Sequence, residues 1–134
     1  ERWLIPFAVV HEGRPVGVVG LGATAWSADR IVGTRAWLAR THQGRGIGRR
    51  ARLMLLEVAF AHLGAAGAVT EVVEDNVASR RITERLGYRE VARTYAEDGA
   101  LELHYLLAPE DWRPHRLDGV QVDGIDTFRA AISP

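Results

Sequence analysis

The loop that most constrains this chain places glycine at alternate positions, Gly44, Gly46 and Gly48, among arginines and directly before an apolar stretch. Apolar residues then recur at three- and four-residue spacing, which predicts a helix over about 49–63 that Gly64 ends. A loop that enters a helix leaves backbone N–H groups unpaired at the positive end of the helix dipole. Glycine removes each Cβ that would keep an anion away from these groups. The loop therefore predicts a phosphate site, with a pyrophosphate as the expected ligand.

Charge is distributed unevenly around this loop, although the net charge of the chain is zero. No acidic residue lies between Asp29 and Glu57, and the same segment contains Arg30, Arg35, Arg40, Arg45, Arg49, Arg50 and Arg52. A positive segment in a neutral protein favours one discrete polyanionic ligand over a long nucleic acid. RNA binding is the weaker alternative, because a series of aromatic stacking residues is not interleaved with the arginines.

Length and composition predict one ordinary globular domain. The chain has 134 residues, of which 47% are hydrophobic and 25% charged. No apolar run approaches the roughly 20 residues of a membrane span, and we expect a cytoplasmic protein. The absence of cysteine excludes disulfides, cysteine–zinc sites and thiol nucleophiles. The first residues lack an initiator Met and the pattern of a signal peptide, so we expect that residues have been lost upstream.

The order of predicted elements indicates an α+β fold with a mixed sheet and helices packed on it. A polar break, "SADR" (27–30), follows the first hairpin. The tail from Pro109 contains one weak amphipathic piece, "IDTFRAAI" (125–132). Asn76 or Ser79 is the expected cap of the second helix, which Gly87 ends. The predicted elements are a hairpin over 6–26, a strand over 31–39, the helix over 49–63, a strand over 68–73, a helix over 78–86, and strands over 88–96 and 100–108.

Two common nucleotide motifs are excluded by the residues of the loop. A Walker loop requires a lysine, and the chain contains none. The dinucleotide fingerprint requires a third glycine where this sequence has Arg49. The pattern that fits is Q-x-x-G-x-G, written Gln43-Gly44-Arg45-Gly46-Ile47-Gly48.

This pattern resembles the pyrophosphate loop of the GNAT superfamily of acetyl-CoA-dependent N-acetyltransferases. A second block, "VEDNVASRRITERLGYRE", is similar to the family's N-x-x-S segment, which is followed by a short helix and L-G-Y. The match extends from about residue 6 to 112 and most resembles the branch of ribosomal-protein N-terminal (alanine-type) acetyltransferases. It implies a GNAT-like mixed, mostly antiparallel sheet flanked by helices, a domain over 1–113 and a C-terminal tail over 114–134.

The family's usual first strand and two helices, which form much of the acceptor pocket, have no counterpart in this chain. Trp26 and Trp37 are candidates to cover the gap, although a buried tryptophan is the default expectation. A bare sheet edge or apolar face favours association with a partner or with a second copy, so a homodimer is one of the two expected assemblies.

The resemblance also implies a set of cofactor contacts. The backbone of Leu38 and Ala39 would pair with the pantetheine arm of acetyl-CoA. Asn76 would bind the pantetheine region in addition to capping its helix, and Ser79 would lie near the thioester sulfur. The pyrophosphate would be surrounded by Gln43, Gly44, Arg45, Gly46, Ile47, Gly48 and Arg49.

The implied reaction is direct transfer of acetyl from acetyl-CoA to a primary amine of a small molecule or a protein N-terminus. Many family members have a tyrosine acid at the position of Thr83, so Ser79 becomes the first choice for the acid, and Tyr88 is expected in the core. Glu71 and Glu74 are the candidate bases, and strand alternation turns only one of them toward the cleft. No histidine shows metal-ligand spacing, and we expect no metal. The alternative is a non-catalytic acyl-CoA-binding or interaction domain with a degenerate acceptor site.

Overall fold

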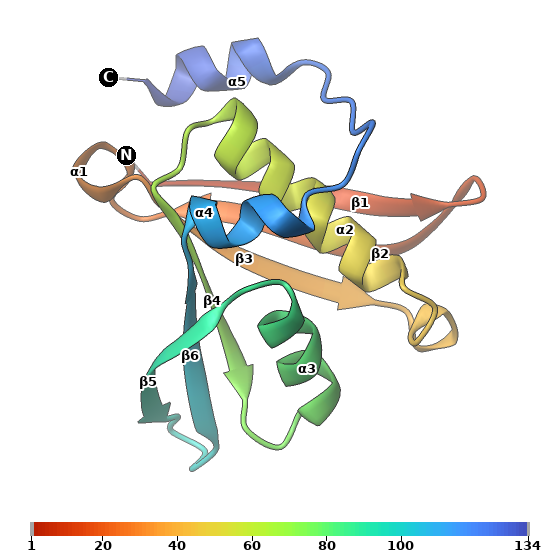
Figure 1. The fold of residues 1–134 in the computed structure, drawn as a ribbon, viewed down its shortest axis with the longest axis vertical. Helices are drawn as coiled ribbons and strands as arrows, with labels where there is room; N and C mark the ends of the chain where they lie inside the picture. The colour runs from red at the N-terminus through yellow and green to blue at the C-terminus, as the bar shows by residue number, and fades with distance from the viewer. Residues whose placement is uncertain (1, 134) are drawn as a thin grey trace.

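The computed structural model describes residues 2–133, which form a six-stranded mixed sheet with helices on it (Figure 1). The strand order is β1-β2-β3-β4-β6-β5, and β3 with β4 is the one parallel pair in that order. The predicted α+β class is therefore confirmed. The strands are β1 (Trp3–His11), β2 (Arg14–Ala23), β3 (Ile31–Leu38), β4 (Gly67–Val73), β5 (Arg89–Tyr95) and β6 (Leu101–Leu107).

The first hairpin turns at Glu12 and Gly13, whose φ angles of 51° and 78° are both positive. Such a two-residue turn matches the twist of antiparallel strands, which explains the tight connection of β1 to β2. The "SADR" segment, expected as a polar break, instead contributes to a short helix, α1 (Trp26–Asp29). The Trp26 side chain is 1% exposed, so it belongs to the core and cannot cover an open face.

The main helix, α2 (Ile47–Leu56), begins two residues before its predicted start, because Gly46 takes the N-cap position. It continues as a π-helical segment, η2 (Glu57–His62), that the sequence pattern did not predict. The second predicted helix is α3 (Val77–Arg85). The remaining helical segments are η1 (Arg40–His42), α4 (Pro109–Trp112), η3 (Arg113–His115) and α5 (Ile125–Ile132).

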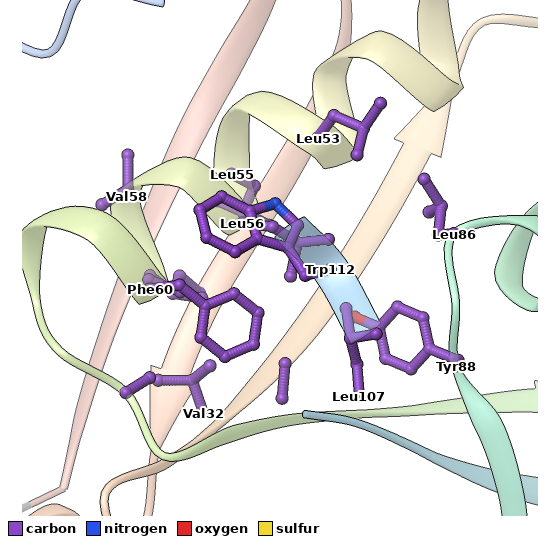
Figure 2. Close-up of a cluster of buried hydrophobic side chains, with 14 of the residues drawn as sticks. Val32, Leu53, Leu55, Leu56, Val58, Phe60, Leu86, Tyr88, Leu107 and Trp112 are labelled. Carbon is purple, nitrogen blue, oxygen red and sulfur yellow. The ribbon is translucent and has the colours of Figure 1, made fainter. Parts of the chain in front are cut away.

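The core lies between the sheet and the helices on one of its faces. Figure 2 shows side chains of α2 and η2 gathered around the Trp112 ring of α4. Phe60 and Trp112 have ring centroids 5.1 Å apart, and Leu56 beside them is 1% exposed. Burial of these large apolar side chains is the main contribution to the stability of the sheet–helix interface.

The segment beyond residue 113 is packed against the rest of the chain. Arg116 Nε donates to both carboxylate oxygens of Glu57, at 2.9 and 3.1 Å, and Glu57 is 4% exposed. The Phe128 ring of α5 lies edge-on to the Trp3 ring, with centroids 5.2 Å apart. The amphipathic piece of the tail forms α5, and no strand occurs in the described part of the tail.

The face of the sheet opposite the helices is open. The strand register places Leu4 beside Gly22, and Val18 beside Trp37, on this face. Leu4 is 70% exposed and Trp37 65%, so a broad apolar surface meets solvent. Association with a second copy over this face stays a prediction. Within residues 2–133, no helix combines the length and hydropathy that a membrane span requires.

Candidate active site

The sheet splits between its two parallel strands. Residues Ile31–Gly33 of β3 pair with residues Gly67–Val69 of β4, and the pairing stops there. The last link between the two strands is a hydrogen bond of 3.1 Å that Thr70 Oγ1 donates to the Thr34 carbonyl. Beyond this link the carboxyl ends of β3 and β4 diverge, and α3 lies between them (Figure 1). Since β3 remains paired with β2 on its other side, its final residues present one unpaired backbone edge to the split.

The free groups on this edge differ from those that the sequence predicted. Both backbone groups of Ala39 are engaged, because its N–H donates to Val16 O at 2.7 Å and its carbonyl accepts from the His42 N–H at 2.8 Å. The Leu38 carbonyl accepts from Gln43 Nε2 at 3.0 Å. Alternation along the strand turns the N–H groups of Ala36 and Leu38 toward the split. Leu38 can therefore make the predicted contact with the pantetheine arm through its N–H. Ala39 could make one only after breaking its bonds to Val16 or His42. Ala36, which the sequence analysis did not name, is an additional candidate.

The glycine loop has the backbone conformation that only glycine adopts without strain. Gly44 has φ 74° and Gly46 has φ 79°, both in the left-handed region. Apart from its chain neighbours, a Cβ on either residue would meet no atom of residues 2–133 within 4 Å, so the space beside them is open to a ligand. Gly48 is different: its φ is not left-handed, and a Cβ there would lie 3.8 Å from Leu38 Cδ2.

The first turn of α2 combines free amides with exposed cations. The N-cap residue, Gly46, has no side chain that could cap the helix. The first intrahelical hydrogen bond runs from the Arg50 N–H to the Gly46 carbonyl, so the preceding N–H groups have no partner within the helix. Ile47 contributes only its backbone, because its side chain is 8% exposed. Arg45 and Arg49 are exposed, and no ion pair within residues 2–133 includes them. This arrangement fits a diphosphate.

The N-terminus of α3 contributes the second predicted block. Of the two expected caps, Asn76 and Ser79, the N-cap is Asn76, whose Oδ1 accepts from the Ser79 N–H at 3.2 Å. Its side-chain NH₂ is not used by the cap. Ser79 lines a concavity of about 1130 Å³ that spans the open face of the sheet and reaches into the split, where Thr34 and Arg52 also line it.

The two candidate bases lie in different surroundings. Glu71 points to the open face, lines the concavity, and has Oε1 3.6 Å from His104 Nδ1. Glu74 lies just beyond the end of β4 and contacts Arg93, with Oε2 3.5 Å from Nη1. It is not among the residues that line the concavity. Glu71 and Ser79 therefore line the same concavity and Glu74 does not, in agreement with the alternation argument.

Three polar residues on neighbouring strands extend the Glu71 environment. His104 is directly opposite Glu71 in the antiparallel pairing of β4 with β6, and its Nε2 lies 2.6 Å from Thr94 Oγ1. A hydrogen bond with Glu71 raises the pKa of Glu102 above its ordinary value, and partial burial and the Glu71 charge act in the same direction. No local sequence pattern indicates this cluster, because it depends on the register of strands far apart in the chain.

Thr83, at the position where the family resemblance implies a tyrosine, is enclosed. Thr83 is 0% exposed, and its hydroxyl accepts from Arg52 Nη1 at 3.1 Å. Tyr88 is 3% exposed, as predicted for a core residue, and its hydroxyl lies 3.1 Å from Thr34 Oγ1. Burial raises the pKa of Tyr88, so the phenol stays neutral at ordinary pH. In the described part of the chain, no group of three His, Asp or Glu side chains has the geometry to hold a metal ion.

Solved structures share this fold. RimJ from Mycobacterium smegmatis, in complex with CoA-disulfide, is 26% identical with a TM-score of 0.74 over 81% of this chain and 54% of its own. A probable acetyltransferase is 23% identical with a TM-score of 0.74, and the match covers 81% of this chain and 64% of that one. A spermidine N-acetyltransferase SpeG chimera from Vibrio cholerae and hSSAT matches with 17% identity and a TM-score of 0.74 over 83% of this chain and 72% of its own.

The chain thus spans between about half and two thirds of the length of the first two of these proteins. The second and third, both less than 25% identical to this chain, show the fold alone. The family model described as "Acetyltransferase (GNAT) domain" matches residues 1–89, which include the split sheet, the glycine loop and the start of β5. On this match over more than half of its length, the chain belongs to the GNAT acetyltransferase family.

Proposed function

We propose that this chain binds acetyl-CoA in the split between β3 and β4 and transfers its acetyl group to a primary amine. The observation that carries the proposal is the proximity of an uncapped, glycine-lined helix start to an unpaired strand edge. The amides of Ile47, Gly48 and Arg49, with the guanidinium groups of Arg45 and Arg49, would bind the diphosphate. The pantetheine arm would then follow β3 toward Ser79.

The edge of β3 supplies the groups that orient the thioester. The N–H groups of Ala36 and Leu38 face the split and can hydrogen-bond to the pantetheine amides or to the thioester oxygen. An amine that approaches from the open face meets Glu71, which would accept the proton that the nitrogen loses on acylation. Ser79 lines the same concavity from α3 and is the proposed donor of a proton to the departing sulfur.

The acceptor class that we place first is a protein N-terminus. The Q-x-x-G-x-G loop and the N-x-x-S block resemble the ribosomal-protein N-terminal acetyltransferases, and RimJ is among the structural neighbours. Spermidine and aminoglycoside acetyltransferases also share the fold at 17% and 18% identity. The open face bearing Glu71 and Glu102 is acidic on the β4–β6 side, which favours a cationic amine.

The test is acetylation by the purified chain of peptides with different N-terminal residues, of spermidine and of an aminoglycoside, with release of the CoA thiol as the measured product. Turnover of any amine supports the proposal, and preference for peptides supports the first-placed class. Saturable CoA binding without turnover would instead support the acyl-CoA-binding alternative, which the buried Thr83 favours. Absence of CoA binding by calorimetry would contradict both.

Glu71 and Glu74 form a matched pair of variants for the base. Both carboxylates are near the end of β4, but only Glu71 lines the concavity. Glu71→Gln is expected to lower kcat about 100-fold near pH 7 and to leave CoA affinity unchanged, since the loss of a general base typically costs 10²–10⁴-fold. Glu74→Gln should retain wild-type kcat. Equal rates in the two variants would remove Glu71 from the mechanism.

A further inference from the structure

The guanidinium of Arg52 lies where α2, α3 and the start of β5 meet. Its Nη1 donates a hydrogen bond of 3.1 Å to the hydroxyl of Thr83, which is fully buried. Its Cζ lies 5.6 Å from the centroid of the buried Tyr88 ring. These two contacts hold the guanidinium in one position and shield part of it from water.

No carboxylate neutralises this charge within the described residues. Arg93, Arg116 and Arg129 each contact a carboxylate, but Arg52 belongs to none of the ion pairs in residues 2–133. The titratable group that faces Arg52 is Tyr88, and burial raises its pKa by more than the Arg52 charge lowers it, so it remains neutral. A half-buried cation without an anionic partner is unfavourable, and an anion bound beside it would remove that cost.

The location of Arg52 restricts which anion can reach it. Arg52 lines the concavity together with Ser79 and Thr34. It lies five residues beyond Ile47, which corresponds to about 7.5 Å along the helix from the first turn of α2. In the proposed function the diphosphate occupies that first turn. The anion expected deeper in the split is the one that forms while the acetyl group is transferred.

We infer that Arg52 stabilises the negative charge that develops on the thioester oxygen and then on the sulfur of acetyl-CoA, an inference that rests on the proposed function. The amine lone pair forms the new C–N bond, and the carbonyl π electrons move to oxygen. When the carbonyl re-forms, the C–S bond breaks and its electron pair leaves on sulfur.

Protons complete the balance of this step. The nitrogen loses one proton to Glu71 or water, and the sulfur gains one from Ser79 or water, which gives the amide and the free thiol. A guanidinium stays protonated throughout and acts as a fixed charge and hydrogen-bond donor rather than as an acid. Arg52 is thus bonded to Thr83, the position at which the family resemblance implies a tyrosine acid.

Coenzyme A and desulfo-coenzyme A, in which hydrogen replaces the thiol, separate a sulfur contact from a phosphate contact. Calorimetric titrations from pH 7 to 9.5 are expected to show wild-type affinity for coenzyme A rising relative to desulfo-coenzyme A as the thiol ionises, by about tenfold for a shift of one unit in thiol pKa. Arg52→Gln should lose this gain and keep its affinity for desulfo-coenzyme A. Its kcat should fall about 100-fold, the typical cost of removing one donor to a developing oxyanion.

Two further variants control the experiment. Arg81→Gln removes an exposed cation from α3 and should match the wild type in both titrations. Arg52→Lys keeps the positive charge, so it should keep part of the pH-dependent gain in affinity for coenzyme A over desulfo-coenzyme A. That result would show that the site stays folded when Arg52 is replaced. If Arg52→Gln weakens both ligands equally, Arg52 serves phosphate binding or folding and the inference is wrong. If the wild type binds neither ligand, the proposed function itself fails.

Discussion

Substitution of Gly46 by alanine separates the conformational role of this glycine from its role in binding. Gly46 has φ 79° and ψ −1°, and a Cβ there would meet no protein atom within 4 Å. The variant therefore loses stability through the backbone alone, at about 1–2 kcal/mol for an L-residue in the left-handed region. Reduced freedom of the unfolded chain offsets about 0.4–1 kcal/mol of this. The expected net loss is about 1 kcal/mol.

This loss converts into a modest change in melting temperature. With an unfolding entropy of about 2.1 cal/mol/K per residue, the 134-residue chain has about 0.28 kcal/mol/K in total. One kcal/mol then lowers Tm by about 4 °C. The added methyl group also occupies the space beside the free amides, so at least one charge-assisted hydrogen bond to phosphate is lost. Such a bond contributes about 1.5–3 kcal/mol, which predicts CoA binding weaker by about 10- to 150-fold.

Gly64→Ala is the matched control. Gly64 has φ 71°, an added Cβ there also meets no atom within 4 Å, and it lies at the other end of the α2–η2 helix, about 24 Å away. The two variants should have the same Tm by differential scanning calorimetry, whereas only Gly46→Ala should lose CoA affinity by isothermal titration. If both variants bind CoA equally well, the first turn of α2 is not the phosphate site.

Three further predictions concern stability and pH. Tyr88→Phe removes the buried contact between its hydroxyl and Thr34, and should cost about 1 kcal/mol in urea unfolding, because Thr34 still reaches the Val69 carbonyl; a loss above about 3 kcal/mol would contradict this. Glu102 has a raised pKa, so its protonated form favours the folded state, and stability should fall as pH rises from 4.5 through the raised value. Glu102→Gln should abolish this fall in urea melts between pH 4 and 7, and an identical pH profile in the two proteins would refute it. Arg116→Ala removes the partner of buried Glu57, so amides of 117–132 should exchange faster with deuterium; unchanged protection would show that α5 is held by Phe128 and Arg129 alone.

Much of the fold followed from local signals in the sequence. The apolar spacing after residue 49 predicted the main helix, and Asn76 and Gly87 marked the ends of the second. These signals work because caps, turns and amphipathic faces depend on residues only a few positions apart. Two predictions were wrong or incomplete because they depended on packing. "SADR" was expected as a polar break but contributes to a short helix, since the large apolar Trp26 packs in the core. At η2 the helix becomes π-helical without a distinct sequence pattern.

The cofactor half of the candidate site was also local. Gln43 to Gly48 and Asn76 to Ser79 lie in two short blocks, and the structure places both beside the split of the sheet. The contact predicted for Ala39 is the exception, because its backbone groups are taken by Val16 and by the His42 N–H. Which edge of a strand is free depends on its neighbours, and a single sequence does not record them.

By itself the sequence therefore determined the glycine-lined helix entrance, a helix cap at Asn76 or Ser79 and the alternation that separates Glu71 from Glu74, since each is a property of a short segment. Tertiary structure alone decided that Arg52 meets Thr83 and Tyr88, with no carboxylate of residues 2–133 paired to it, and that His104 and Glu102 lie beside Glu71. Those groups are brought together by strand register and helix packing, and such long-range contacts are fixed only when the whole core is assembled.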